Sequence, residues 1–82
     1  MAWQNDIIET REAHLRAVFA ERSNDWHLVI RDYLVCFGAA ERAGDERAVR
    51  FFAAKLVAAY NATGMLDKAH VYGEIAAVQF SP

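Results

Sequence analysis

The stretch that decides the fold is WHLVIRDYLVCFGAAERAGDERAVRFFAAKLVAAY, residues 26–60. Apolar residues on both sides of its centre recur at the i, i+3, i+4, i+7 spacing of an amphipathic helix. Between the two runs, Gly44 suits a helix C-terminus and Asp45 suits the N-cap of the next helix, so the two helices are predicted to be antiparallel. The predicted inward stripes are Trp26, Val29, Ile30, Tyr33, Phe37 and Ala40, then Val49, Phe52, Leu56 and Tyr60.

One further helix is predicted on each side of this pair. The first begins near Asn5 or Asp6, where Asp6 and Glu9 have the spacing of a capping box, and it ends at the polar run RSND, residues 22–25. A residue of that run, Ser23, Asn24 or Asp25, then caps the next helix. The inward stripe predicted for the first helix is Ile8, Leu15, Val18 and Phe19.

The last helix is predicted from Met65 to Gln79, after a turn that ends at Gly64. Its predicted inward residues are Leu66, Ala69, Tyr72, Ala76 and Phe80. Short turns between helices of similar length favour antiparallel neighbours. The sequence therefore predicts one all-α domain over residues 1–82, with four antiparallel helices arranged as a bundle or as helical hairpins.

Composition narrows the class of protein. Hydrophobic residues make up 55% of the 82 residues, above the roughly 45–50% of an average soluble domain. The charges nearly balance, with 9 basic and 11 acidic residues, whereas a free-standing nucleic-acid binder usually carries a basic field. Cys36 is the only cysteine, so no internal disulfide can form. With neither a secretory signal nor an apolar run long enough to span a membrane, we expect a cytoplasmic protein.

The last two helices carry a familiar set of small and aromatic residues. Leu56, Tyr60, Gly64, Ala69 and Ala76 stand at the spacing found in a tetratricopeptide-repeat hairpin, which this segment resembles. The aromatic residue expected before the second alanine and the closing proline are each displaced. The upstream helices are out of the family's period, so the chain resembles one such hairpin packed on longer helices. The resemblance implies a protein-interaction role and no particular ligand.

Three of the predicted helices carry a second apolar face besides the inward one. On the last helix, Val71, Ile75 and Val78 recur at i, i+4 and i+7 opposite the inward stripe. Phe51 lies off the inward stripe of the third helix, and Leu28 and Val35 lie off that of the second. Apolar faces that a simple bundle leaves uncovered are typical of contacts with another protein, so these six residues are predicted interface residues. The alternative is that the second and last helices are wrapped more fully than in a simple bundle.

The candidate chemical groups do not form a recognisable site. Asp67, His70 and Glu74 share one helical face, but no second Glu-x-x-His segment exists to complete a ferritin-like metal site, so a solvated polar face is expected. The other two histidines, His14 and His27, have no ligand spacing and are expected to be ordinary surface or boundary residues. Cys36 has no neighbouring base to activate it, so a buried structural thiol is predicted. We therefore expect no catalytic residue, cofactor or metal, and no enzymatic activity.

Two groups of arginines leave alternatives open. Arg11 and Arg22 project close to the apolar stripe of the first helix, either with stems covering its edge or as anchors for a partner's carboxylate or phosphate. In the second case Arg11 joins the six residues above as a predicted interface residue. Arg42, Arg47 and Arg50 surround the turn at Gly44, among Glu41, Asp45 and Glu46. The sequence thus favours a small protein–protein interaction module, an adaptor, assembly chaperone or regulator that acts as a homodimer or in a heteromeric complex. The alternative is a nucleic-acid-associated regulator, from a phage or mobile element, that uses the second arginine group.

Overall fold

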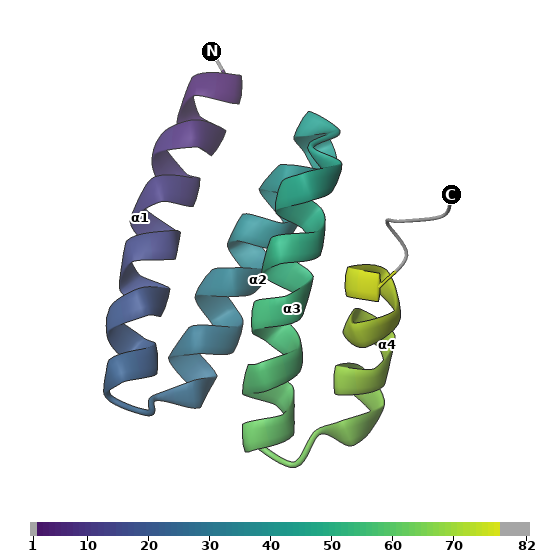
Figure 1. Ribbon diagram of the computed structural model, residues 1–82. Helices are drawn as coiled ribbons and strands as arrows, with labels where there is room; N and C mark the ends of the chain where they lie inside the picture. The colour runs from purple at the N-terminus through teal and green to yellow at the C-terminus, as the bar shows by residue number, and fades with distance from the viewer. Residues whose placement is uncertain (1, 78–82) are drawn as a thin grey trace.

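The computed structural model describes the backbone of residues 2–77 and the side chains of residues 7–77. The described chain folds into α1 (Ala2–Arg22), α2 (Trp26–Ala43), α3 (Glu46–Ala62) and α4 (Leu66–Ala77), joined by short turns (Figure 1). The prediction of an all-α protein with four antiparallel helices is confirmed.

The turns form where the capping residues predicted them. Asp25 caps α2 by accepting a hydrogen bond from the Leu28 amide at 3.4 Å, and Asp45 caps α3 through the Ala48 amide at 3.1 Å. Gly44 follows α2 with a φ of 68°, in the left-handed region that glycine enters without strain. The predicted turn between the two central helices is therefore confirmed at the residues that were expected to make it.

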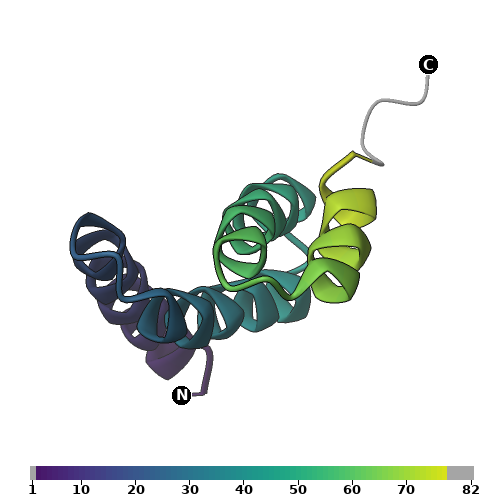
Figure 2. The ribbon, with the colours of Figure 1, turned by 90° about the horizontal axis from the view of Figure 1, so that it is seen from below.

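The helices lie in an open row. Among the described residues, extensive packing joins only helices that follow one another in sequence. Seen end-on, α3 lies over α2, and α1 and α4 lie at opposite ends of the row (Figure 2). The molecule measures 38 × 38 × 16 Å between Cα atoms, so it is a thin layer. Each of the two end helices consequently has its main packing against a single neighbour.

The core lies along α2 and α3. Val29, Tyr33 and Leu56 are fully buried, and Phe37, Phe52 and Tyr60 are nearly so. Tyr60 stacks on Tyr72 of α4, with 5.6 Å between the ring centroids. These are the inward positions that the helical periodicity predicted for the two central helices, so that part of the core is confirmed.

The first helix differs from its prediction in two respects. It begins at Ala2, so Asp6 lies inside α1 rather than at a capping position. The predicted inward stripe is also wrong, because Ile8, Leu15 and Phe19 are exposed and Val18 is only half-buried. The residues that α1 buries are instead Ala13, Ala17 and Ala20. Alanine has a single methyl group, so this face lets α1 approach α2 closely, where a stripe of leucine and phenylalanine would hold the helices apart.

The inward face of α4 is confirmed in part. Ala69 is buried, and Tyr72 and Ala76 are half-buried against the core. Leu66 was also predicted to face inward, but it begins the helix and is largely exposed. Phe80 lies outside the described residues.

Candidate functional site

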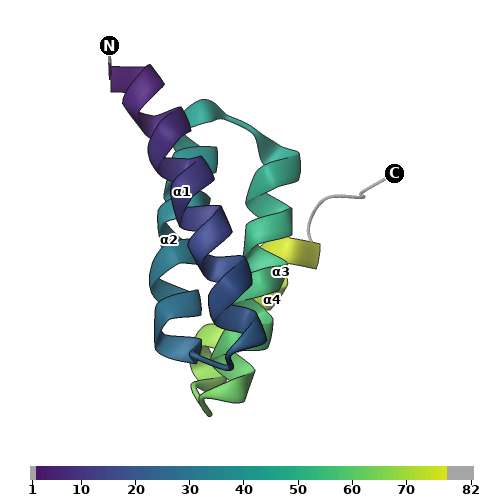
Figure 3. The ribbon, with the colours of Figure 1, turned by 90° about the vertical axis from the view of Figure 1, so that its left-hand side faces the viewer.

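The outer face of α1 carries an exposed apolar stripe. Ile8, Leu15 and Phe19 recur at i, i+7 and i+11, on the side of the helix opposite its buried alanines. Their exposed fractions are 56%, 60% and 56%. Figure 3 looks along the row from the α1 end, and no other described helix covers this side of α1. We call these three residues the α1 stripe.

Charged residues border the α1 stripe. The Arg22 guanidinium lies over the Phe19 ring, 5.6 Å from its centroid, in a cation–π contact. Arg11 and Glu12, one turn before Leu15, are also exposed. The prediction that Arg22 lies close to this stripe is confirmed by that contact. Arg11 and Arg22 are both exposed, so neither is buried as an anchor within the monomer.

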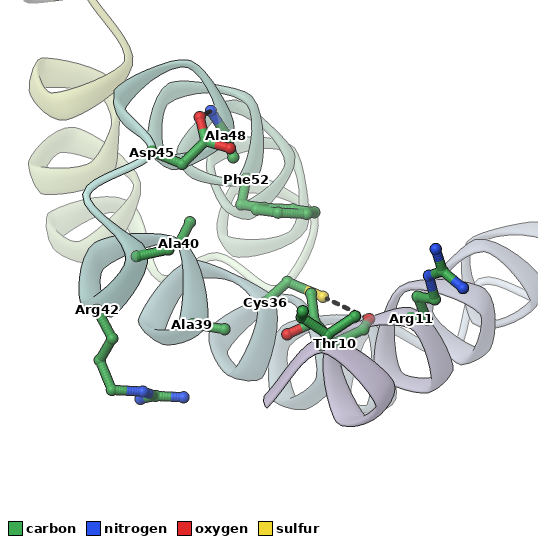
Figure 4. A pocket seen from close by; sticks show the side chains of 11 residues that line it. Thr10, Arg11, Cys36, Ala39, Ala40, Arg42, Asp45, Ala48 and Phe52 are labelled. Atoms are coloured by element: carbon green, nitrogen blue, oxygen red, sulfur yellow. Dashed lines mark hydrogen bonds between the residues drawn. The ribbon is translucent and has the colours of Figure 1, made fainter. Parts of the chain in front are cut away.

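A cleft opens beside the stripe, on the side of α1 that faces α3. It has a volume of about 500 Å³ between the first half of α1, the second half of α2 and the start of α3. Cys36, Thr10 and Phe52 meet at its centre, while Arg11 and Arg42 extend outward at its two sides (Figure 4). The walls are mainly apolar, with alanines such as Ala40 along α2 and α3. Such a space can receive an apolar side chain from a partner but offers few polar groups to orient a small ligand.

Cys36 is a structural thiol, as the sequence predicted. Its side chain is fully buried, and Sγ donates a hydrogen bond to the Thr10 carbonyl oxygen at 3.6 Å. Burial, reinforced by the nearby charge of Asp32, raises the pKa of the thiol to about 11. The thiolate, which is the nucleophilic form, is therefore scarce at neutral pH.

The far end of the gap between α1 and α3 is closed by side chains. The His14 ring of α1 meets Phe52 and Phe51 of α3, with centroid distances of 5.3 and 5.9 Å. Two turns further along α1, Glu21 accepts a hydrogen bond from the Tyr33 hydroxyl and pairs with Lys55, whose Nζ lies 3.8 Å from Oε1. Burial and then the Glu21 hydrogen bond raise the Tyr33 pKa well above its usual range. His14 was expected to be an ordinary boundary residue, and its position between aromatic rings could not be read from its sequence neighbours.

An ion pair with a buried carboxylate joins α1 to α2, one helical turn before Cys36 on α2. The Asp32 carboxylate is buried, and its Oδ1 lies 3.3 Å from Nη2 of the half-exposed Arg16 and 3.5 Å from Nε of Arg31. Leaving a buried charge without a partner is costly, so the contact with Arg16 holds this part of α1 against α2. This pair could not be identified from the sequence, because Arg16 and Asp32 stand 16 positions apart.

The predicted interface residues are spread over the molecule. On α4, Val71 is 54% exposed, Ile75 is half-buried against the core, and Val78 lies outside the described residues. Phe51 is 47% exposed and its ring meets that of His14, whereas Leu28 and Val35 are half-buried against the core. Their role in an interface remains a prediction. Arg11 is the one predicted interface residue that borders both the α1 stripe and the cleft.

The other candidate groups lie on the surface. Asp67, His70 and Glu74 are exposed, and His70 Nε2 lies 2.8 Å from Glu74 Oε1. No cluster of three or more potential metal ligands occurs in the described part of the chain. Of the arginines near the Gly44 turn, Arg42 and Arg47 are exposed and Arg50 is half-buried, and the acidic residues around them are exposed too. His27 is also exposed.

No family model matches the chain, and searches of curated proteins and of solved structures find no match either. Within the described residues, no helix is long and apolar enough to cross a membrane.

Proposed function

We propose that this protein is a small helical interaction module, which binds another protein chain through the outer face of α1. The observation that carries the proposal is the α1 stripe, three large apolar side chains in line along one exposed helix face. Single exposed apolar residues are ordinary, but an aligned stripe is the surface that a helix presents to a partner helix. The acting unit is an adaptor, an assembly chaperone or a regulator.

Two further observations support this proposal. First, the cleft next to the stripe provides apolar space in which a partner's side chain could be buried, and Arg11 lies between the two surfaces. Second, the resemblance of α3 and α4 to a tetratricopeptide-repeat hairpin points to the same class of function, although it names no ligand. An enzymatic proposal has less support, because the Cys36 thiol, the candidate nucleophile, is buried and little ionised.

The experiment compares variants of the two end helices as baits. The α1 bait carries Leu15→Glu and Phe19→Glu, and the control bait carries Val71→Glu, which alters an equally exposed residue on α4. Because all three positions are exposed, circular dichroism should show the same helix content in each variant. Each immobilised bait is incubated with extract of the producing cells, and retained proteins are quantified by mass spectrometry.

We expect the wild type and the Val71→Glu control to retain the same specific proteins. Recovery with the α1 bait should fall by about tenfold or more, since central apolar anchors carry most of the binding energy of an interface. Equal recovery with the wild type and the α1 bait would contradict the proposal. Loss of recovery with the Val71→Glu control alone would move the binding surface to α4.

A further inference from the structure

We propose that the cleft between α1, α2 and α3 binds a monomeric long-chain carboxylate, with the alkyl chain inside the cleft and the head group on Arg11. This inference goes beyond the proposed function, because it assigns a small-molecule ligand to the cleft and does not depend on what binds the α1 stripe. The shape of the cleft, the state of its polar groups and the position of Arg11 carry it.

The α2 wall of the cleft is straight and made of small side chains. Cys36, Ala39 and Ala43 line it at i, i+3 and i+7, which places them along one face of the helix. At 1.5 Å per residue, this line is about 10 Å long. The volume of about 500 Å³ lies within the range of ligand-binding pockets. An extended alkyl chain has the shape and the apolar surface that such a wall can cover.

The polar groups at the centre of the cleft are paired with each other. The Cys36 thiol donates its hydrogen bond to the carbonyl oxygen of Thr10, and Phe52 covers this pair from α3 (Figure 4). A hydroxyl, amide or charged group of a ligand at this place would lose its hydrogen bonds to water without gaining new ones, which disfavours binding. The part of the ligand that enters the cleft is therefore a hydrocarbon. A flexible alkyl chain needs no polar group to orient it along its length.

Arg11 provides a positive charge at the Cys36 end of the cleft. It directly follows Thr10 in α1, and its exposed guanidinium extends outward at the side of the cleft (Figure 4). Within the described residues, no carboxylate lies within ion-pair distance of Arg11, whereas Arg16 and Lys55 each pair with one. A guanidinium binds a carboxylate through two parallel hydrogen bonds, so the head group of the ligand fits here.

The opposite end of the cleft does not suit an anionic head group. Asp45 lines the cleft there, just after Ala43, and its Oδ1 accepts the hydrogen bond of the Ala48 amide. A second carboxylate beside Asp45 would be repelled. The ligand is therefore oriented with its head on Arg11 and its chain running along α2 toward Ala43.

Isothermal titration calorimetry of the full chain tests this site with straight-chain carboxylates of six to twelve carbons, each kept below its micelle concentration. Each added pair of methylene groups should tighten binding by about 4- to 16-fold, for half or complete burial, until the chain outgrows the cleft. Decanoate should bind with a Kd of about 0.1–1 mM. Decyltrimethylammonium, which has the same chain and the opposite charge, should bind at least about tenfold more weakly.

Substitutions that fill the cleft test the position of the chain. Ala39→Leu places a larger side chain on the α2 wall and should weaken decanoate binding by about tenfold or more. Because Ala39 is half-buried, Ala43→Leu at an exposed position of the same wall is a second variant, and it should weaken binding too. Ala58→Leu, the same change at an exposed position of α3 outside the cleft, should bind like the wild type. Circular dichroism checks that each variant is folded.

A pair of arginine variants tests the position of the head group. Arg11→Gln should weaken decanoate binding by about tenfold, without weakening the binding of decyltrimethylammonium. Arg47→Gln removes the same charge from an exposed residue outside the cleft and should leave both affinities unchanged.

Four results would overturn the proposal. The first is no heat of binding for decanoate or dodecanoate at any concentration below micelle formation. The second is equal affinity for decanoate and decyltrimethylammonium, and the third is an equal effect of Ala39→Leu and Ala58→Leu. The fourth is retention of the chain on vesicles of anionic lipid without binding of monomeric carboxylates, which would show a membrane surface as the ligand. If decanoate does not bind but Ala39→Leu loses extract proteins that the wild type retains, the cleft holds a side chain of a protein partner instead.

Discussion

Replacing a leucine with alanine should have very different effects on α1 and on α3. Leu56 is fully buried in the core, whereas Leu15 is 60% exposed on the α1 stripe. The two substitutions delete the same atoms, so the difference between them measures the packing around each site. If the stripe lies outside the monomer core, Leu56→Ala will be much more destabilising than Leu15→Ala.

The magnitudes follow from burial. At Leu56 the chain loses the transfer free energy of the side chain and gains a cavity, which together cost about 3–5 kcal/mol. The covered two fifths of Leu15 contribute about 1 kcal/mol at most, and the higher helix propensity of alanine offsets a few tenths of that. A domain of 82 residues has a total stability of about 4–12 kcal/mol, so Leu56→Ala removes a large share of it.

Urea unfolding followed by circular dichroism at 222 nm separates the two cases. With a urea dependence near 1 kcal/mol per molar, Leu56→Ala should lower the midpoint by about 3 M and Leu15→Ala by less than about 1 M. Equal shifts of about 3 M for the two variants would refute the packing of α1 through its alanines.

Three further predictions concern the turns, the thiol and the buried ion pair. Gly64→Ala should lower the free energy of unfolding by about 1 kcal/mol, because φ at this position is 77°. Gly73→Ala should leave it unchanged or raise it, because a Cβ added there would have its nearest contact at 3.8 Å. Thermal unfolding of the two variants compares these effects. Iodoacetamide should alkylate Cys36 at pH 8 at least about 100-fold more slowly in the folded chain than in urea, and equal rates would contradict its burial. The folded pKa of this thiol lies above its usual 9.0, so the stabilisation it provides is complete below about pH 9 and is lost as the pH rises toward 11, which urea titrations across that range can follow. Arg16→Met should lower the urea midpoint of unfolding more than the double change Arg16→Met with Asp32→Leu. The single change leaves the buried Asp32 carboxylate without the Arg16 cation, whereas the double change removes both charges. A lower midpoint for the double variant would contradict this reasoning.

The central hairpin could be predicted because several local signals agree there. Asp45 and Gly44 each favour the same turn, and the apolar period is unbroken on both sides of it. At such a place the periodicity, the capping residues and the core all lead to one structure. The interior positions of α2 and α3, such as Tyr33 and Leu56, therefore follow from the sequence.

The first helix could not be predicted in the same way because it carries two stripes of equal period. Ile8, Leu15 and Phe19 form one and the buried alanines form the other, and the rule that large apolar residues lie inside selects the wrong one. The choice depends on how much room α2 leaves, which is a property of tertiary packing. The contacts of His14 with Phe51 and Phe52 escape prediction for the same reason, since they join residues far apart in sequence.

The open row and the exposed stripe have one physical origin. Because α1 packs on α2 through alanines, it contributes little apolar area to the core. The ion pair between Arg16 and the buried Asp32 carboxylate is a further contact between the two helices. Small domains bury a low fraction of their surface and often gain stability through association. The large side chains of α1 are therefore available for a partner without weakening its contact with α2. Substitutions on the α1 stripe should accordingly change association while leaving the monomer fold nearly intact, and substitutions at the alanines should do the opposite.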